Sequence, residues 1–587
     1  MNTTKLCAMK LFITLIFAAL ITTSLAYKKI TGMSVTQTSG RSAQHQKRVV
    51  LRCAPPSFNE GSANASAIPL LKGWGNYRMP VTTANDSARI YFNQGINMYY
   101  GFHIIEALAS FAKATLFDSS FAMGYWGQAL AMGPNINGAN YNTPADALIA
   151  AQKARALGTH CTPVEKELIA SMLQRYTPDP TGGQQQLYQA YATALKKIMT
   201  RYPRQTDVRV LYADALMQLH PWDLYTADYQ PRPWTPELID VLEKALKNEP
   251  RHPGALHYYI HAVEASTHPE RGLMAANQLP ALMPGIAHLV HMPSHIYIRT
   301  GYYDKGDRVN EAAVKSYYTY AHTFAAVKEA SPLYLVHTLH MQAACANMAG
   351  RFGDALRIAK ECRESFDSSA LKQPGFDGVF AQYIYMTPML TMIRFGKWET
   401  ILSAPEVPDT YIYASIIAHY GRGMAYARTY QTRMASRELE LLRKNLSDPQ
   451  LTAPASPGNN PAIHGAQIAE KILASVIAEE QNDLEQAIVL LEQAVKKEDN
   501  MAYSEPKDWA LPARQYLGAA LLKAKRYGDA QRVYERDLEI NPKNGWSLLG
   551  LAMAFQKQGQ KSGAAKMQQQ AAKAFENSDV SISGSVF

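Results

Sequence analysis

The amino-acid sequence predicts an all-α solenoid, in which helical hairpins stack into a right-handed superhelix. Three observations predict it. From about residue 85 the chain is almost continuously amphipathic, with short Gly/Pro turns between the segments. Two histidine pairs with the same i,i+4 spacing, His257/His261 and His291/His295, lie 34 residues apart. Small and bulky residues recur at fixed positions in segments of that length, as they do in stacked repeats.

A register of small and bulky residues defines the repeats. In one segment Gly95 and Phe111 occupy positions 8 and 24, and in another Gly518 and Tyr534 do, with Pro542 at position 32. A small residue at position 8 lets two helices approach closely, the bulky residue at 24 fills the remaining space, and proline ends the second helix. The period and the register together predict roughly nine or ten tetratricopeptide-repeat-like hairpins.

Composition divides the chain into four parts. Residues 1–26 are typical of a secretory signal peptide, because a basic start precedes an apolar stretch and a small-residue cleavage site. Residues 27–80, rich in Ser, Gln, Asn, Gly and Pro, predict a linker or a poorly ordered arm. Residues 81–577 predict the helical array, and residues 578–587 a frayed tail. We therefore expect an exported protein, periplasmic or secreted, with no integral membrane segment in the mature chain.

Charge and cysteine usage exclude some functions. The net charge of +10 is spread along the chain, and no Lys/Arg block favours nucleic acid as a partner. The five cysteines are scattered without CxxC spacing, so the sequence predicts neither a disulfide framework nor a thiolate metal site.

Histidines concentrate in the middle of the array. In tetratricopeptide repeats, which the register resembles, the first helix of each hairpin lines a concave groove. The resemblance implies that six histidines face this groove: His257, His261, His291, His295, His337 and His340. Axes of packed helices lie about 8–10 Å apart, so imidazoles from adjacent helices can converge.

Neutral imidazole is a common ligand of zinc, copper and iron. The sequence therefore predicts a candidate site for a divalent transition metal (Zn, Cu or Fe) in the groove. The alternative that these histidines are ordinary polar packing residues stays open. His268 and His288 lie nearer to helix ends, where cap or turn roles are expected.

Further polar residues are candidates for supporting the histidines. Glu264, on the first histidine-bearing helix, and Asp223, in a loop rich in proline and aromatic residues, are candidate carboxylate partners. Ser294 lies between two histidines, but no nucleophile elbow surrounds it, so a serine hydrolase is not indicated. The segment 257–261 lacks the glutamate of HExxH, which excludes a zincin motif.

A second group of candidate residues lies near the C-terminus. Glu505, Trp509 and Arg514 could together recognise a charged or aromatic ligand. The alternative is structural: the prolines of this segment stiffen the entry to a helix, Trp509 packs, and Arg514 pairs with Glu505.

Several segments resemble a large, mostly uncharacterised family of bacterial tetratricopeptide-repeat proteins. They include HYYIHAVEA at 257–265, HMPSHIY at 291–297 and the EPxxWxxPxR pattern at 505–514. The resemblance extends from about residue 85 to 575. It implies a helical-repeat fold and a context compatible with export, and it implies no established activity.

The expected function is that of an exported scaffold that binds a peptide or protein partner in its concave groove, with the histidine-lined metal site in addition. The alternative is a metal-dependent enzyme, a hydrolase or an oxygenase, that uses the histidine cluster. Whether the chain is an enzyme stays open from sequence alone.

Overall fold

The computed structural model describes residues 68–139, 144–177, 183–323, 332–453 and 460–587. Regular structure in these ranges is α-helical, apart from short 3₁₀ turns and the strands β1 (Pro134–Asn135) and β2 (Gly138–Ala139), which pair antiparallel. The all-α class predicted from the sequence is confirmed. The predicted signal peptide and most of the predicted arm lie outside the described residues.

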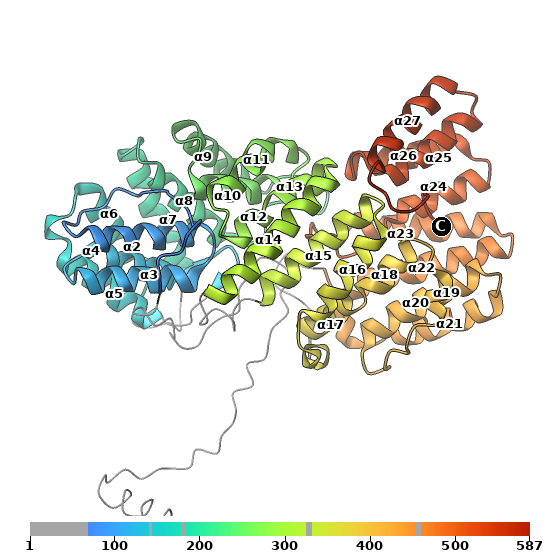
Figure 1. Cartoon of the computed structure of the whole chain (residues 1–587), viewed down its shortest axis with the longest axis horizontal. Helices are drawn as coiled ribbons and strands as arrows, with labels where there is room; N and C mark the ends of the chain where they lie inside the picture. The colour runs from blue at the N-terminus through green and yellow to red at the C-terminus, as the bar shows by residue number, and fades with distance from the viewer. Residues whose placement is uncertain (1–67, 140–143, 178–182, 324–331, 454–459) are drawn as a thin grey trace, which may run out of the picture. The chain divides into compact units, whose positions relative to one another are not determined.

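Helices follow one another along the whole described chain (Figure 1). The first part, blue to green, contains α2 (Asp86–Tyr100), α3 (Ile104–Phe117), α4 (Ala122–Ala131), α5 (Pro144–Leu157), α6 (Pro163–Met172), α7 (Gln184–Arg201), α8 (Thr206–Leu219), α9 (Thr235–Asn248), α10 (Pro253–Val263), α11 (Leu273–Leu282), α12 (Ala287–His291), α13 (Pro293–Thr300) and α14 (Tyr303–Thr323). The second part, yellow to red, contains α15 (Pro332–Met348), α16 (Phe352–Glu364), α17 (Phe376–Tyr385), α18 (Thr387–Arg394), α19 (Trp398–Leu402), α20 (Ile412–Arg428), α21 (Thr432–Asn445), α22 (Ala462–Glu480), α23 (Leu484–Asp499), α24 (Ala513–Lys523), α25 (Tyr527–Ile540), α26 (Gly545–Lys557) and α27 (Lys561–Ala574).

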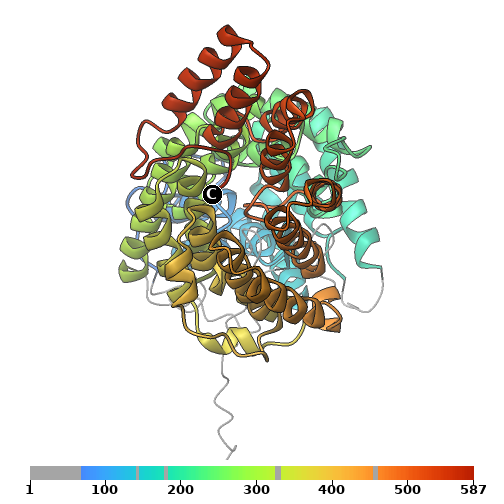
Figure 2. The ribbon, with the colours of Figure 1, turned by 90° about the vertical axis from the view of Figure 1, so that its right-hand side faces the viewer.

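Most helices pack against the next helix in the chain, as a solenoid of hairpins requires. The pair α26 and α27, in red, lies side by side in both views (Figures 1 and 2).

Contacts inside the hairpins follow the predicted register. A Cβ atom added to Gly95 in α2 would lie 2.7 Å from the ring of Phe111 in α3, and one added to Gly518 in α24 would lie 2.4 Å from the ring of Tyr534 in α25. These are the residues assigned to positions 8 and 24. Because a methyl group would overlap each ring, glycine is required for the helices to pack this closely. The tetratricopeptide-like hairpins are therefore present.

The apolar core consists of two clusters of buried side chains. The first extends from Ile68 to Tyr320, and the second from Ala287 to Ala554. The two clusters overlap in sequence from 287 to 320, the stretch that contains three of the histidines singled out above. Residues of both clusters therefore lie next to the histidines in the sequence.

The C-terminal tail is ordered by polar contacts. Asp579 accepts the backbone N–H of Gly353 at 2.6 Å, and the hydroxyl groups of Ser585 and Tyr534 lie 2.7 Å apart. Ser585 is 3% exposed. The prediction of a frayed tail at 578–587 is therefore wrong, because its polar side chains satisfy groups of α16 and α25 that would otherwise lack partners.

The packed array also begins before residue 80. Trp74 and Met79 are buried, and the backbone N–H of Leu71 donates to the side-chain oxygen of Gln94 at 2.9 Å. The predicted linker or arm thus does not extend through these last residues. In the part of the chain that the structure describes, no helix combines the length and the apolarity needed to cross a bilayer.

Candidate metal centre

Helix α10 presents two histidines on one face. His252 caps the helix by accepting the N–H of Ala255 at 3.2 Å, and Pro253 occupies the first turn, where its missing N–H costs nothing. His257 and His261 follow one turn apart, and both are buried. The cap and the proline therefore fix which face of α10 the histidines occupy.

The other histidine segment is split between two short helices. Pro293 begins α13, since it cannot supply the N–H that would continue α12. Met292 between the helices nevertheless keeps right-handed helical angles, φ −48° and ψ −36°. The side chains of His291 and His295 therefore stay on one side, and their Nε2 atoms lie 2.8 Å apart.

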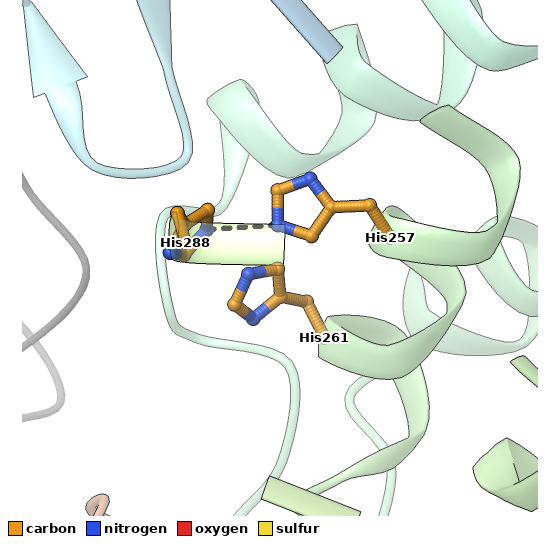
Figure 3. Close-up of side chains that lie close together, drawn as sticks. All are labelled: His257, His261 and His288. Carbon is orange, nitrogen blue, oxygen red and sulfur yellow. Dashed lines mark hydrogen bonds between the residues drawn. The ribbon is translucent and has the colours of Figure 1, made fainter. Parts of the chain in front are cut away.

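Three groups of potential metal ligands are found among the described residues. Within each group the ligand atoms lie within 4.8 Å of one another, and every member is buried. The groups are His257, His261 and His288; His291, His295 and His337; and His261, Glu264 and His295. Figure 3 shows the rings of the first group, from α10 and α12, gathered close together.

Five of the six predicted histidines converge, and His288 takes the place of the sixth, His340. His340 belongs to none of the three groups, and its ring packs against Tyr383 with centroids 5.7 Å apart. His288, expected to be a cap or turn residue, lies with its Nε2 atom 3.0 Å from that of His257. In the sequence, His288 precedes His291 by three residues, a spacing that places both side chains on the same face of a helix.

The histidines do not line an open groove, so that part of the prediction is wrong. All six predicted groove histidines are at most 7% exposed. Phe102 packs against His257 with ring centroids 4.4 Å apart, and the segment before α24 covers the other side, where the carboxylate of Glu505 contacts Nδ1 of His295. Chain segments distant in sequence therefore enclose the cluster.

Two of the imidazoles are oriented by neutral acceptors. Nδ1 of His257 donates to the backbone carbonyl of Tyr100 at 2.6 Å. Nδ1 of His291 lies 2.5 Å from Oδ1 of Asn310, whose amide nitrogen donates to the carbonyl of Gly306. Since these oxygens can only accept, Nδ1 carries the proton in both rings, and Nε2 keeps the lone pair.

Carboxylates orient two further imidazoles. Glu264 accepts from Nδ1 of His261 at 2.9 Å and from Nδ1 of His295 at 2.5 Å, and the hydroxyl of Tyr503 donates to it at 3.3 Å. Glu505 contacts the same nitrogen of His295. A carboxylate on Nδ1 is the arrangement that usually orients metal-ligating histidines, because it fixes the tautomer with Nε2 as the ligand atom.

Burial keeps four rings of the cluster neutral. Removal from water, together with neighbouring imidazoles, lowers the pKa of His257, His288, His291 and His337 well below the usual value for histidine. These rings are therefore neutral at neutral pH, which is the form that binds metal ions.

The nitrogen separations suit metal ligation. The two facing Nε2 pairs are 3.0 Å apart (His257 and His288) and 2.8 Å apart (His291 and His295). Two nitrogen ligands, each about 2.0–2.1 Å from a metal ion, lie about 2.8–3.4 Å apart at angles between square and tetrahedral geometry. Small shifts would therefore admit an ion between either pair.

Two predicted supporting residues take other positions. Oδ1 of Asp223 accepts from Arg232 at 2.8 Å and so belongs to the loop between α8 and α9, outside the three ligand groups. Ser294 is buried with its Oγ atom 3.5 Å from Nδ1 of His291.

The C-terminal trio is divided among different partners. Arg514 forms a two-pronged ion pair with Asp499, at 2.6 and 2.5 Å, and not with Glu505. Trp509 is buried, with its ring 5.6 Å from that of Tyr420. Of the three, only Glu505 contacts the histidine centre, the name used from here on for the residues of the three ligand groups: His257, His261, Glu264, His288, His291, His295 and His337. Sequence reasoning could not have paired Glu505 with a histidine more than two hundred residues away.

A cavity of about 80 Å³ adjoins the centre. Its lining includes His340, Arg394, Tyr503, Glu505 and Trp509. Two of these residues also reach the centre, since Tyr503 donates to a carboxylate there and Glu505 contacts a histidine. A small molecule in the cavity would therefore lie next to the histidines.

A scan against known protein families gives no match, and a search of curated proteins gives none either. Solved structures that align with the chain include the human IFIT1 dimer with m7Gppp-AAAA, at 13% identity over 84% of this chain and 91% of that chain, with a TM-score of 0.29. Yeast Tom70 aligns at 12% identity over 83% and 92%, TM-score 0.27, and the P58(IPK) TPR domain at 11% over 84% and 99%, TM-score 0.22. At such scores these alignments say nothing about what the chain binds. The chain is a tetratricopeptide-like helical array by the geometry of its own hairpins.

Proposed function

We propose that the chain is a helical-repeat metalloprotein whose buried histidine centre holds a divalent transition metal such as zinc, copper or iron. One observation carries the proposal: four imidazoles, those of His257, His261, His291 and His295, each have an acceptor on Nδ1. This leaves Nε2 as the ligand nitrogen in all four rings. Two such nitrogens facing each other repel unless a proton or a metal ion lies between them.

The residues fit a metal by charge as well as by geometry. Glu264 and Glu505 bring two carboxylates into a buried site that also contains the neutral rings of His257, His288, His291 and His337. A divalent cation would balance their charge, and without a cation two buried carboxylates are costly. A bound metal would supply a Lewis acid at this position.

Metal content tests the proposal. We expect the full chain, purified without a histidine tag, to contain near-stoichiometric metal, and the His261→Ala/His295→Ala variant to lose it while keeping its helical circular dichroism. His340→Ala is the matched control, because it removes a buried histidine outside the three ligand groups. The proposal would be refuted if the protein contained no metal and its thermal midpoint did not change when zinc, copper or iron was added. Full occupancy in the double variant would also refute it.

A metal-dependent enzyme, a hydrolase or an oxygenase, is the second candidate function. The cavity beside Glu505 favours it, because a catalytic metal needs access for substrate and an open coordination position. Azide added to the cobalt-substituted protein reports on that position: a changed visible spectrum supports catalysis, and an unchanged spectrum indicates a closed structural site.

Binding of a peptide or protein by the helical scaffold is a separate proposal, and the buried histidines lend it no support. We also propose export from the pattern in residues 1–26. N-terminal sequencing of the protein from its own cells tests this, with cleavage after Ala26 expected and an uncleaved N-terminus counting against it.

A further inference from the structure

We infer that the centre binds two metal ions, one in each histidine triad. The first triad is His257, His261 and His288, and the second is His291, His295 and His337. This inference rests on the proposed metal function and makes it more specific.

Each triad is organised around its own central ring. In the first, the ring of His257 lies 4.9 Å from the rings of both His261 and His288. In the second, the ring of His291 lies 4.8 Å from that of His295 and 4.7 Å from that of His337. No histidine belongs to both triads, so the protein supplies three imidazoles for each ion.

Between the triads, the rings lie farther apart than each central ring lies from its two partners, although the two outer rings of the first triad, those of His261 and His288, are themselves 6.3 Å apart. The ring of His261 lies 5.8 Å from that of His295, and the ring of His288 lies 6.2 Å from that of His291. Each triad also contains its own facing pair of Nε2 atoms, at 3.0 Å in the first and 2.8 Å in the second. There are therefore two places where an ion could replace a proton between facing nitrogens.

Glu264 lies where the triads meet. It touches one ligand of each, His261 through Oε1 and His295 through Oε2. These three residues form the third group of potential ligands, in which a single ion could in principle be held. Their Nδ1 atoms, however, already donate to the carboxylate, so the carboxylate serves as the acceptor that orients one histidine of each triad.

Charge indicates what else the centre would bind. Two divalent ions carry four positive charges, and Glu264 and Glu505 supply two negative charges in a buried site. Three imidazoles leave each ion with an open position. The remaining positive charge favours an anionic ligand at these positions.

Zinc stoichiometry tests the inference. The full chain is stripped with a chelator, dialysed against Zn²⁺ alone and analysed for bound zinc. We expect two equivalents in the wild type and in the control His340→Ala. The variants His257→Ala/His288→Ala and His291→Ala/His337→Ala should each retain one equivalent, because each loses one triad and leaves the other intact.

The outcomes separate this inference from the proposed function. One equivalent in the wild type, abolished by either pair of substitutions, would mean a single shared ion and would overturn the inference while the metal function stands. No bound zinc in the wild type would overturn both. If a double variant loses its helical circular dichroism, the single changes His288→Gln and His337→Gln replace it. Each should then halve the zinc content, and full occupancy in both would again refute the two-ion centre.

Discussion

Replacing Glu264 by glutamine removes one charge and one acceptor from the middle of the histidine centre. The carboxylate now accepts from Nδ1 of His261 and from Nδ1 of His295. An amide of the same size has one oxygen that accepts and one nitrogen that donates. Only one of the two imidazoles can therefore keep its bond to residue 264, and the other loses one of the acceptors that fix its proton on Nδ1.

The size of the effect follows from this loss of orientation. Removing an acceptor behind a metal-ligating histidine typically lowers metal affinity by about 10–100-fold. That corresponds to about 1.4–2.7 kcal/mol of binding free energy at 25 °C. We expect the change to lie towards the lower end, because Glu505 still contacts Nδ1 of His295 and preserves the orientation of that ring.

Zinc affinity, measured by competition with a chromophoric chelator, tests this prediction. The matched control is Glu438→Gln, which alters a buried carboxylate that accepts from Nδ1 of His419 at 2.7 Å, outside the three ligand groups. Circular dichroism confirms that both variants remain helical. If Glu264→Gln binds zinc within twofold of the wild type, or if the control loses affinity equally, the orienting role is wrong.

Two further predictions concern stability. Burial raises the pKa of Asp214 to about 6, above its value in the unfolded chain, so the native state holds this proton more tightly. Stability should therefore fall by about 3 kcal/mol as the pH rises from about 3 to 7, and Asp214→Asn should remove that part of the pH dependence of urea unfolding. Gly518→Ala should destabilise the array by about 1–3 kcal/mol, because its methyl group would overlap a buried tyrosine ring. Gly528→Ala, where the flexible end of the Arg532 side chain lies 3.9 Å from the added methyl group, should be neutral or stabilise by up to about 1 kcal/mol.

Both stability predictions can fail clearly. A wild type and an Asp214→Asn variant with parallel pH profiles of unfolding free energy would mean that the buried carboxyl titrates normally. Equal thermal midpoints for the two glycine variants would mean that the close helix approach is not required.

The fold could be predicted from the sequence because it depends on local rules. Gly518 and Tyr534 lie within one repeat, and their contact follows from the spacing alone. The pairing of His257 with His261 is likewise a property of one helix. Such short-range patterns fixed the hairpins and placed five of the converging histidines.

The rest of the site depends on how distant segments pack, which no local pattern encodes. Glu505 reaches His295 only because the segment before α24 covers α13. His288, expected near a helix end, does lie in the first turn of α12, but its ring also reaches that of His257 in α10. The tail appeared frayed because its contact residues in α16 and α25 are far away in sequence.

Anomalous diffraction at the zinc edge, from crystals of the zinc-loaded chain, tests the central claim most directly. The account predicts anomalous peaks about 2.0–2.1 Å from the Nε2 atoms of the histidine triads, with Glu264 on Nδ1 of His261 and His295 and not on the metal. An absence of peaks in the cluster, or a metal held by the Nδ1 atoms and the Glu264 carboxylate, would contradict it.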